Sequence, residues 1–141
     1  MNILRSVLQN LPEFQQLLAA LDGGQSPAAV SGLGAVHRAH FAAALGAASE
    51  RPVVVVCADE SECERMARGL AFFTGQSVPV LTARQFTFHN AATVSHQWEH
   101  RRLKLLWALS EGELPCLVAS VEALQQRTLP PDVLKQATLE L

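Results

Sequence analysis

The stretch VSGLGAVHRAH, residues 30–40, has the outline of a phosphate-binding loop between a strand and a helix. A working loop reads G-x-x-x-x-G-K-[ST], because its backbone wraps the phosphates, its lysine neutralises them and its hydroxyl binds Mg²⁺. Counting from Gly32, the second glycine falls at His37, the lysine at Arg38 and the hydroxyl at Ala39. A histidine obstructs the wrap and an alanine cannot bind a metal, so we predict a degenerate site. The loop residues from which we expect no cofactor binding are Gly32, Gly34, His37, Arg38 and Ala39.

Strands alternate with helices around this loop, which predicts an α/β fold with a three-layer, mostly parallel sheet. The expected strands cover residues 28–31, 53–57, 78–81 and 116–120, and a further one begins at 138–141. The expected helices cover residues 11–21, 36–48, 60–74, 95–110 and 121–126. Residues 53–57, VVVVC, are a β-branched run typical of a strand buried on both faces. Residues 82–93 are expected to be irregular, and the two prolines at 130 and 131 to break the chain.

Length and charge limit the class of protein. A chain of 141 residues can bury one core. Its net charge of −2 predicts no strong attraction to nucleic acid or membrane. We find no apolar run that would span a bilayer and no signal peptide. The chain has three cysteines without a paired pattern, which favours a reducing cytoplasm. We expect these cysteines to be buried structural thiols.

Two other motifs offer alternatives at the same edge of the sheet. GLGAVH, residues 32–37, is a dinucleotide fingerprint that lacks its last glycine, and Asp59 stands where an acid would bind the ribose. A nucleotide- or dinucleotide-binding enzyme domain is therefore the alternative function. Residues 53–60 also resemble a strand that ends in a Mg²⁺-binding acid. The simpler interpretation is that Asp59 caps the helix that follows.

The histidines and the basic residues carry weaker signals. His96 and His100 are spaced by one helical turn, but no third ligand is indicated, so we predict no metal site. Arg101, Arg102 and Lys104 form a candidate contact surface, for which a solvated helix face paired with Glu99 is the default. Use of this stretch to bind DNA is a further hypothesis, which the negative net charge disfavours. Trp98 and Trp107 are expected to anchor their helix in the core.

Several stretches in order resemble the N-terminal, UvrB-like domain of bacterial transcription-repair coupling factors (Mfd). They are SGLGA (31–35), PVVVVCAD (52–59), LAFF (70–73), RLKLL (102–106) and CLVASVEALQQR (116–127), followed by LPP (129–131). The resemblance runs from about residue 11 onward. UvrB itself keeps an intact loop and a long Tyr-rich DNA-binding hairpin, for which residues 86–94 are too short. Where coupling factors usually have Leu-Pro-Tyr and an acid, this chain has FTFH at 86–89.

The resemblance implies a RecA/UvrB-like fold, with a degenerate P-loop NTPase domain at 1–136 and the start of a following domain at 137–141. It implies a cytoplasmic parent protein that releases stalled RNA polymerase and recruits UvrA in nucleotide-excision repair. RNA polymerase and DNA would be bound by an ATP-dependent translocase and other domains absent here. UvrA would be bound mainly by the domain that follows. The present domain would be non-catalytic, with no cofactor and no metal, and would scaffold the UvrA-binding module and interdomain contacts.

Overall fold

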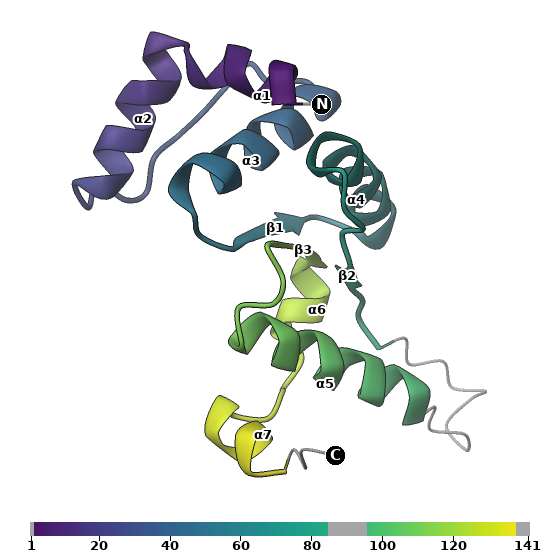
Figure 1. Ribbon diagram of the computed structural model, residues 1–141. Helices are drawn as coiled ribbons and strands as arrows, with labels where there is room; N and C mark the ends of the chain where they lie inside the picture. The colour runs from purple at the N-terminus through teal and green to yellow at the C-terminus, as the bar shows by residue number, and fades with distance from the viewer. Residues whose placement is uncertain (1, 85–95, 138–141) are drawn as a thin grey trace.

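A computed structural model describes residues 2–84 and 96–137, which form an α/β fold around a small parallel sheet (Figure 1). The strands are β1 (Val53–Cys57), β2 (Val80–Leu81) and β3 (Cys116–Ser120), in the spatial order β1-β3-β2. Val53 lies opposite Cys116 and Val80 lies opposite Val118, in parallel register. Parallel strands need long crossover connections, which explains why helices separate them along the chain.

Helices cover both faces of the sheet, which gives three layers. The helices are α1 (Asn2–Gln9), α2 (Pro12–Asp22), α3 (Ala35–Ser49), α4 (Glu60–Thr74), α5 (His96–Ser110), α6 (Val121–Gln125) and α7 (Pro131–Ala137). Figure 1 shows α3 and α4 on one face of the sheet and α5 and α6 on the other. The first two helices pack outside α3, and α7 packs against α5. The α/β class and the parallel sheet are therefore confirmed.

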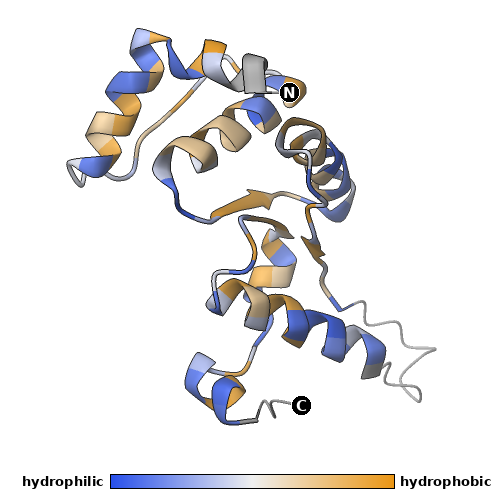
Figure 2. Cartoon of the chain, viewed as in Figure 1, coloured by the Kyte–Doolittle hydropathy of each residue, from blue (hydrophilic) through white to orange (hydrophobic). Residues whose placement is uncertain are grey.

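Each face of the sheet has its own apolar core. Leu70, Cys63 and Val118 are fully buried between the sheet and the α3–α4 layer. Leu117 and Ala123 belong to the second core, against which the apolar side chains of α5 pack. Figure 2 shows the same pattern, with hydrophobic residues along the strands. The cores fix the sheet relative to both helical layers.

The boundaries of α4 follow from its capping residues. Asp59 accepts a hydrogen bond from the backbone N–H of Glu62 at 2.7 Å, which is the geometry of an N-cap. Gly75 ends the helix with φ of 75°, a left-handed conformation that glycine adopts without a Cβ clash. Its N–H donates to the carbonyl of Ala71 at 2.9 Å. The predicted helix at 60–74 and the capping role of Asp59 are both confirmed.

The strand predicted at 28–31 is wrong, and so is the burial on both faces predicted for the strand at 53–57. Residues 28–31 are exposed and lie outside the sheet, because two alanines have low strand propensity and bury little apolar surface. The run at Val53–Cys57 is not buried on both faces, since Val54 and Val56 are 43% and 50% exposed. β1 is an edge strand of the three-stranded sheet, and the apolar core beneath α5 and α6 contains residues of β2 and β3 but none of β1.

Other boundaries differ in detail. β2 begins at Val80 rather than at residue 78, because Pro79 cannot donate to the ladder. The expected break at 130–131 is followed directly by α7, whose first residue is Pro131, a position that proline favours. Helix α1 has no counterpart in the sequence-based assignment. The strand expected at 138–141 and most of the irregular segment lie outside the described residues. None of the described helices is long and apolar enough to cross a membrane.

Candidate functional site

The loop that resembles a nucleotide site leads directly into α3. Gly32 has φ of 81°, a left-handed conformation that glycine permits, and Gly34 is the N-cap residue of the helix. The helix therefore begins at Ala35, before the positions expected for the second glycine and the lysine. His37 and Arg38 are exposed on its first turns. At His37 the backbone is already helical, so this residue is not part of a loop that wraps a phosphate.

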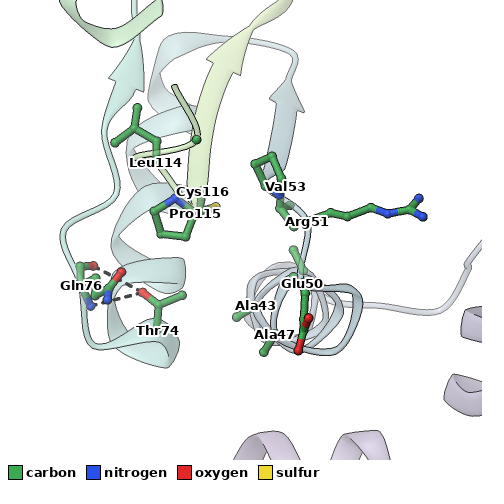
Figure 3. Close-up of a pocket in the computed structure, with 14 residues that line it drawn as sticks. Ala43, Ala47, Glu50, Arg51, Val53, Thr74, Gln76, Leu114, Pro115 and Cys116 are labelled. Atoms are coloured by element: carbon green, nitrogen blue, oxygen red, sulfur yellow. Dashed lines mark hydrogen bonds between the residues drawn. The ribbon is translucent and has the colours of Figure 1, made fainter. Parts of the chain in front are cut away.

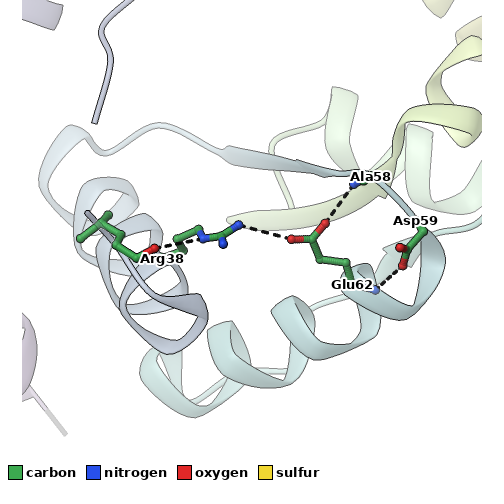
Figure 4. Close-up of polar contacts among 5 residues, drawn as sticks. Arg38, Ala58, Asp59 and Glu62 are labelled. Atoms are coloured by element: carbon green, nitrogen blue, oxygen red, sulfur yellow. Dashed lines mark hydrogen bonds and ion pairs between the residues drawn. The ribbon is translucent and has the colours of Figure 1, made fainter. Parts of the chain in front are cut away.

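Arg38 is held by neighbouring groups rather than presented to a ligand (Figure 4). Its Nη1 lies 3.4 Å from Oε1 of Glu62, and its Nε donates to the carbonyl of Leu33 at 3.3 Å. The other carboxylate oxygen of Glu62 accepts from the backbone N–H of Ala58 at 3.1 Å. A carboxylate thus takes the place that a phosphate would fill beside this cation. Glu62 would also repel an incoming phosphate.

Ala39, at the position of the metal-binding hydroxyl, belongs to the packing of α3 on α4. It is 2% exposed. A Cβ built on Gly69 of α4 would lie only 2.8 Å from the Cβ of Ala39. The two helices therefore cross closely at this pair of small residues, and position 39 faces a neighbouring helix. Beside them lies a cavity of about 400 Å³, lined by Arg38, Glu62 and Met66 among others.

The acid at the end of β1 is engaged in capping. Asp59 uses Oδ1 to cap α4, as described above, and Figure 4 shows it turned toward the helix. The position of the metal-binding hydroxyl in this loop is taken by Ala39, which has no ligand atom in its side chain. In the described part of the chain, no group of three or more His, Cys, Asp or Glu residues is arranged to hold a metal ion.

A second cavity of about 440 Å³ lies at the opposite, amino end of the strands (Figure 3). Its wall includes Ala43, Ala47, Val53 and Cys116. The hydroxyl of Thr74 accepts a hydrogen bond from the backbone N–H of Gln76 at 3.3 Å, so it is engaged within its own segment. Ligands of open parallel sheets bind at the carboxyl ends of the strands, so this cavity is in the wrong place for a nucleotide.

The three cysteines are buried, as predicted. Burial, with a smaller contribution from the nearby Cys57, raises the pKa of Cys63 to about 12. Burial also raises the pKa of Cys57 and of Cys116. A raised pKa disfavours the thiolate, which is the nucleophilic form. None of the three thiols is therefore poised for catalysis.

The residues of the basic stretch on α5 differ in how deeply they are buried. Arg101 and Lys104 are exposed, whereas Arg102 is only 7% exposed. The prediction that these residues form a solvated face paired with Glu99 is wrong for Arg102. Its guanidinium lies 5.6 Å from the ring centroid of Trp98, and Glu99 pairs instead with Arg84 at 3.7 Å. The periodicity of a single helix cannot predict the burial of Arg102, because the elements that cover this residue come from elsewhere in the chain.

Gln126, beside the same basic stretch, carries no sequence signal. Gln126 follows α6, and its side chain clamps the backbone of Arg84. Its Oε1 accepts from the N–H of Arg84 at 3.0 Å and its Nε2 donates to the carbonyl at 3.3 Å. The expectation that Trp98 and Trp107 anchor their helix in the core is wrong, since both are half-buried and lie outside both core clusters. On α3, at the other face of the sheet, His40 is half-buried, and its ring stacks on Phe73 with centroids 4.6 Å apart.

Comparisons with known proteins give two related results. The chain is 31% identical over 135 residues, 86% of its length, to the transcription-repair-coupling factor of Myxococcus xanthus. It is 21% identical over 140 residues, 99% of its length, to the transcription-repair-coupling factor of Bacillus subtilis (strain 168). It spans only 11% and 12% of the length of these relatives. No family model matches the sequence, and no solved structure matches it significantly. The two similarities support the transcription-repair-coupling factors as the family of this chain.

Proposed function

We propose that this chain is the UvrB-like domain of a transcription-repair coupling factor, in which it scaffolds the module that binds UvrA. Its fold would be that of a P-loop NTPase whose nucleotide site has degenerated. The domain would have no catalytic activity and no cofactor of its own. The whole protein would work in the cytoplasm, where other domains would bind RNA polymerase and move along DNA.

The observation that carries this proposal is the occupation of the nucleotide loop by the protein's own side chains. Arg38 is paired with Glu62 at 3.4 Å, and Ala39 is buried against α4. A phosphate-binding loop needs a free cation and a hydroxyl that reaches a metal. Here the cation is shared with Glu62 and the hydroxyl is absent, while α3 and α4 pack closely at Ala39 and Gly69. A fold retained without its ligand chemistry fits a structural role.

The experiment is a chimera of a known coupling factor. The matching segment of the Myxococcus xanthus relative would be replaced by this chain, and the chimera and the isolated chain would each be tested for retention of UvrA. We expect the chimera to retain UvrA, because the domain supports the binding module. We expect the isolated chain to retain little or none.

Two results would contradict the proposal. Retention of UvrA by the isolated chain as strongly as by the chimera would move the binding surface onto this domain. A chimera that folds, as judged by circular dichroism, but fails to retain UvrA would show that this chain does not support the module. The natural relative, purified in parallel, is the matched control.

A further inference from the structure

Arg102 is a buried cation without an anionic partner in the part of the chain that the structure describes. Its Nη2 donates to the carbonyls of Ala123 at 2.9 Å and Gln126 at 3.4 Å. Its Nε and Nη1 make no hydrogen bond. None of the ion pairs among residues 2–84 and 96–137 includes it. Burying a charge without a counter-ion costs stability, so this arrangement requires an explanation.

Capping of α6 explains only part of the arrangement. The carbonyls of Ala123 and Gln126 lie in the last turn of α6 and just after it, where a cation is favourable. Both bonds use one nitrogen of the guanidinium. The buried Nε and Nη1 take no part in the cap.

Arg102 lines a cavity of about 500 Å³ between α5 and the segment that follows α6. Arg84 and Arg127 line the same cavity, against a single carboxylate, that of Glu99. Because Glu99 is paired with Arg84 at 3.7 Å, the charges of Arg102 and Arg127 are in excess. This local excess of positive charge occurs in a chain whose net charge is −2.

We propose that this cavity binds a carboxylate side chain of a partner protein, with the exposed Arg127 as its hydrogen-bonding ligand and Arg102 as a buried positive charge in the cavity wall. Guanidinium groups recognise carboxylates through strong, charge-assisted hydrogen bonds. Trp98, Leu103 and Leu129 add an apolar wall, which suits an acidic residue flanked by apolar ones. Glu99 at the same cavity disfavours the higher charge of a phosphate. Burial lowers the pKa of Arg102, a cost that a bound anion would relieve.

Trp98 provides the signal for a direct test. The chain has two tryptophans, so Trp107→Phe leaves Trp98 as the single reporter. This variant would be titrated with the blocked peptide acetyl-Leu-Glu-Leu-amide, with its Gln counterpart, and with inorganic phosphate at matched ionic strength. We expect a saturable change in emission with the Glu peptide and none with the Gln peptide.

Two further substitutions separate the site from general electrostatic attraction. Arg127→Gln should weaken binding of the Glu peptide by about tenfold or more, the loss expected for one charge-assisted hydrogen bond. Lys104→Gln removes an exposed charge from α5, the helix of Arg102, outside the cavity wall, and should change binding by less than about twofold. Since Arg127 is exposed, its loss should leave the fold intact.

The proposal would be overturned by an equal response to the Glu and Gln peptides, or by equal losses in the Arg127 and Lys104 variants. Tighter binding of phosphate than of the Glu peptide would also contradict it, because the ligand would then not be a carboxylate. Arg102→Gln should weaken the response as well, because it removes the buried charge in the cavity wall, and circular dichroism would verify that this variant folds. The test is independent of UvrA, so its failure would leave the proposed function untouched.

Discussion

Replacing Gly69 by alanine should destabilise the protein, although alanine favours helices. A Cβ at this position would lie 2.8 Å from the Cβ of Ala39, which is a rigid neighbour. The helices α3 and α4 must then separate, at a cost of about 1–3 kcal/mol for overpacking. The gain in helix propensity is only about 1 kcal/mol. We therefore expect a net loss of about 1 kcal/mol or somewhat more, with a fall in the melting temperature of about 3–6 °C.

The same geometry predicts that Ala39→Gly rescues Gly69→Ala. Alone, Ala39→Gly should cost about 2 kcal/mol, from lost burial of a methyl group and lost helix propensity. In the double variant the two propensity terms cancel and one methyl group again lies between the helices. We expect the double variant to lie within about 1 kcal/mol of the natural chain, far from the sum of the single effects.

Urea unfolding followed by circular dichroism would measure this cycle. The control pairs Gly69→Ala with Ala47→Gly, since Ala47 is exposed on the same α3 helix. The two effects should add in that control, because the residues share no contact. The reasoning would be refuted if Gly69→Ala stabilised the protein, or if Ala39→Gly and Gly69→Ala were also additive. Ala39 would then not be a packing residue.

Three further predictions concern individual side chains. Arg38→Ala should change the free energy of unfolding by no more than about 0.5 kcal/mol in urea, because its ion pair with Glu62 is exposed; a loss above about 2 kcal/mol would contradict this. Asp59→Ala should cost about 1 kcal/mol through loss of the N-cap, whereas the exposed Glu64→Ala on the same helix should cost less than about 0.5 kcal/mol. Stability should fall as pH rises from 9.0 toward about 12, because the raised pKa of Cys63 favours the folded state only while the unfolded thiol remains protonated. Cys63→Ala should reduce that slope in alkaline urea titrations, and an unchanged slope would show that another group is responsible.

The sequence predicts local features of the fold well. The helix at Glu60–Thr74 has its N-cap, its acidic first turn and its C-terminal glycine encoded within a few residues, and its boundaries match the structure. The strand Cys116–Ser120 is likewise a short apolar run that the structure buries completely. Such signals depend on neighbours in the chain, so pattern alone can identify them.

Features that depend on distant partners are not predictable in this way. The exposure of Val54 depends on the number of strands in the sheet and on which of them the helices cover. The burial of Arg102 depends on α6 and the residue after it, because its two hydrogen-bond acceptors, Ala123 and Gln126, lie 21 and 24 residues further along the chain. Similarly, motif spacing places Arg38 at the position that a lysine takes in a nucleotide loop, but only the three-dimensional arrangement brings Glu62 to it. The sequence therefore predicts which motif positions the loop residues occupy, but it does not predict their interactions.

Calorimetric titration of the intact chain with ATP and Mg²⁺ tests the central claim most directly. The claim is that Arg38, Glu62 and Ala39 have converted a nucleotide loop into a packed helix start. We predict no binding tighter than about 1 mM, with or without Mg²⁺. Micromolar binding that requires Mg²⁺ and is lost in Arg38→Ala would contradict the account, because it would show that the loop still functions as a nucleotide site.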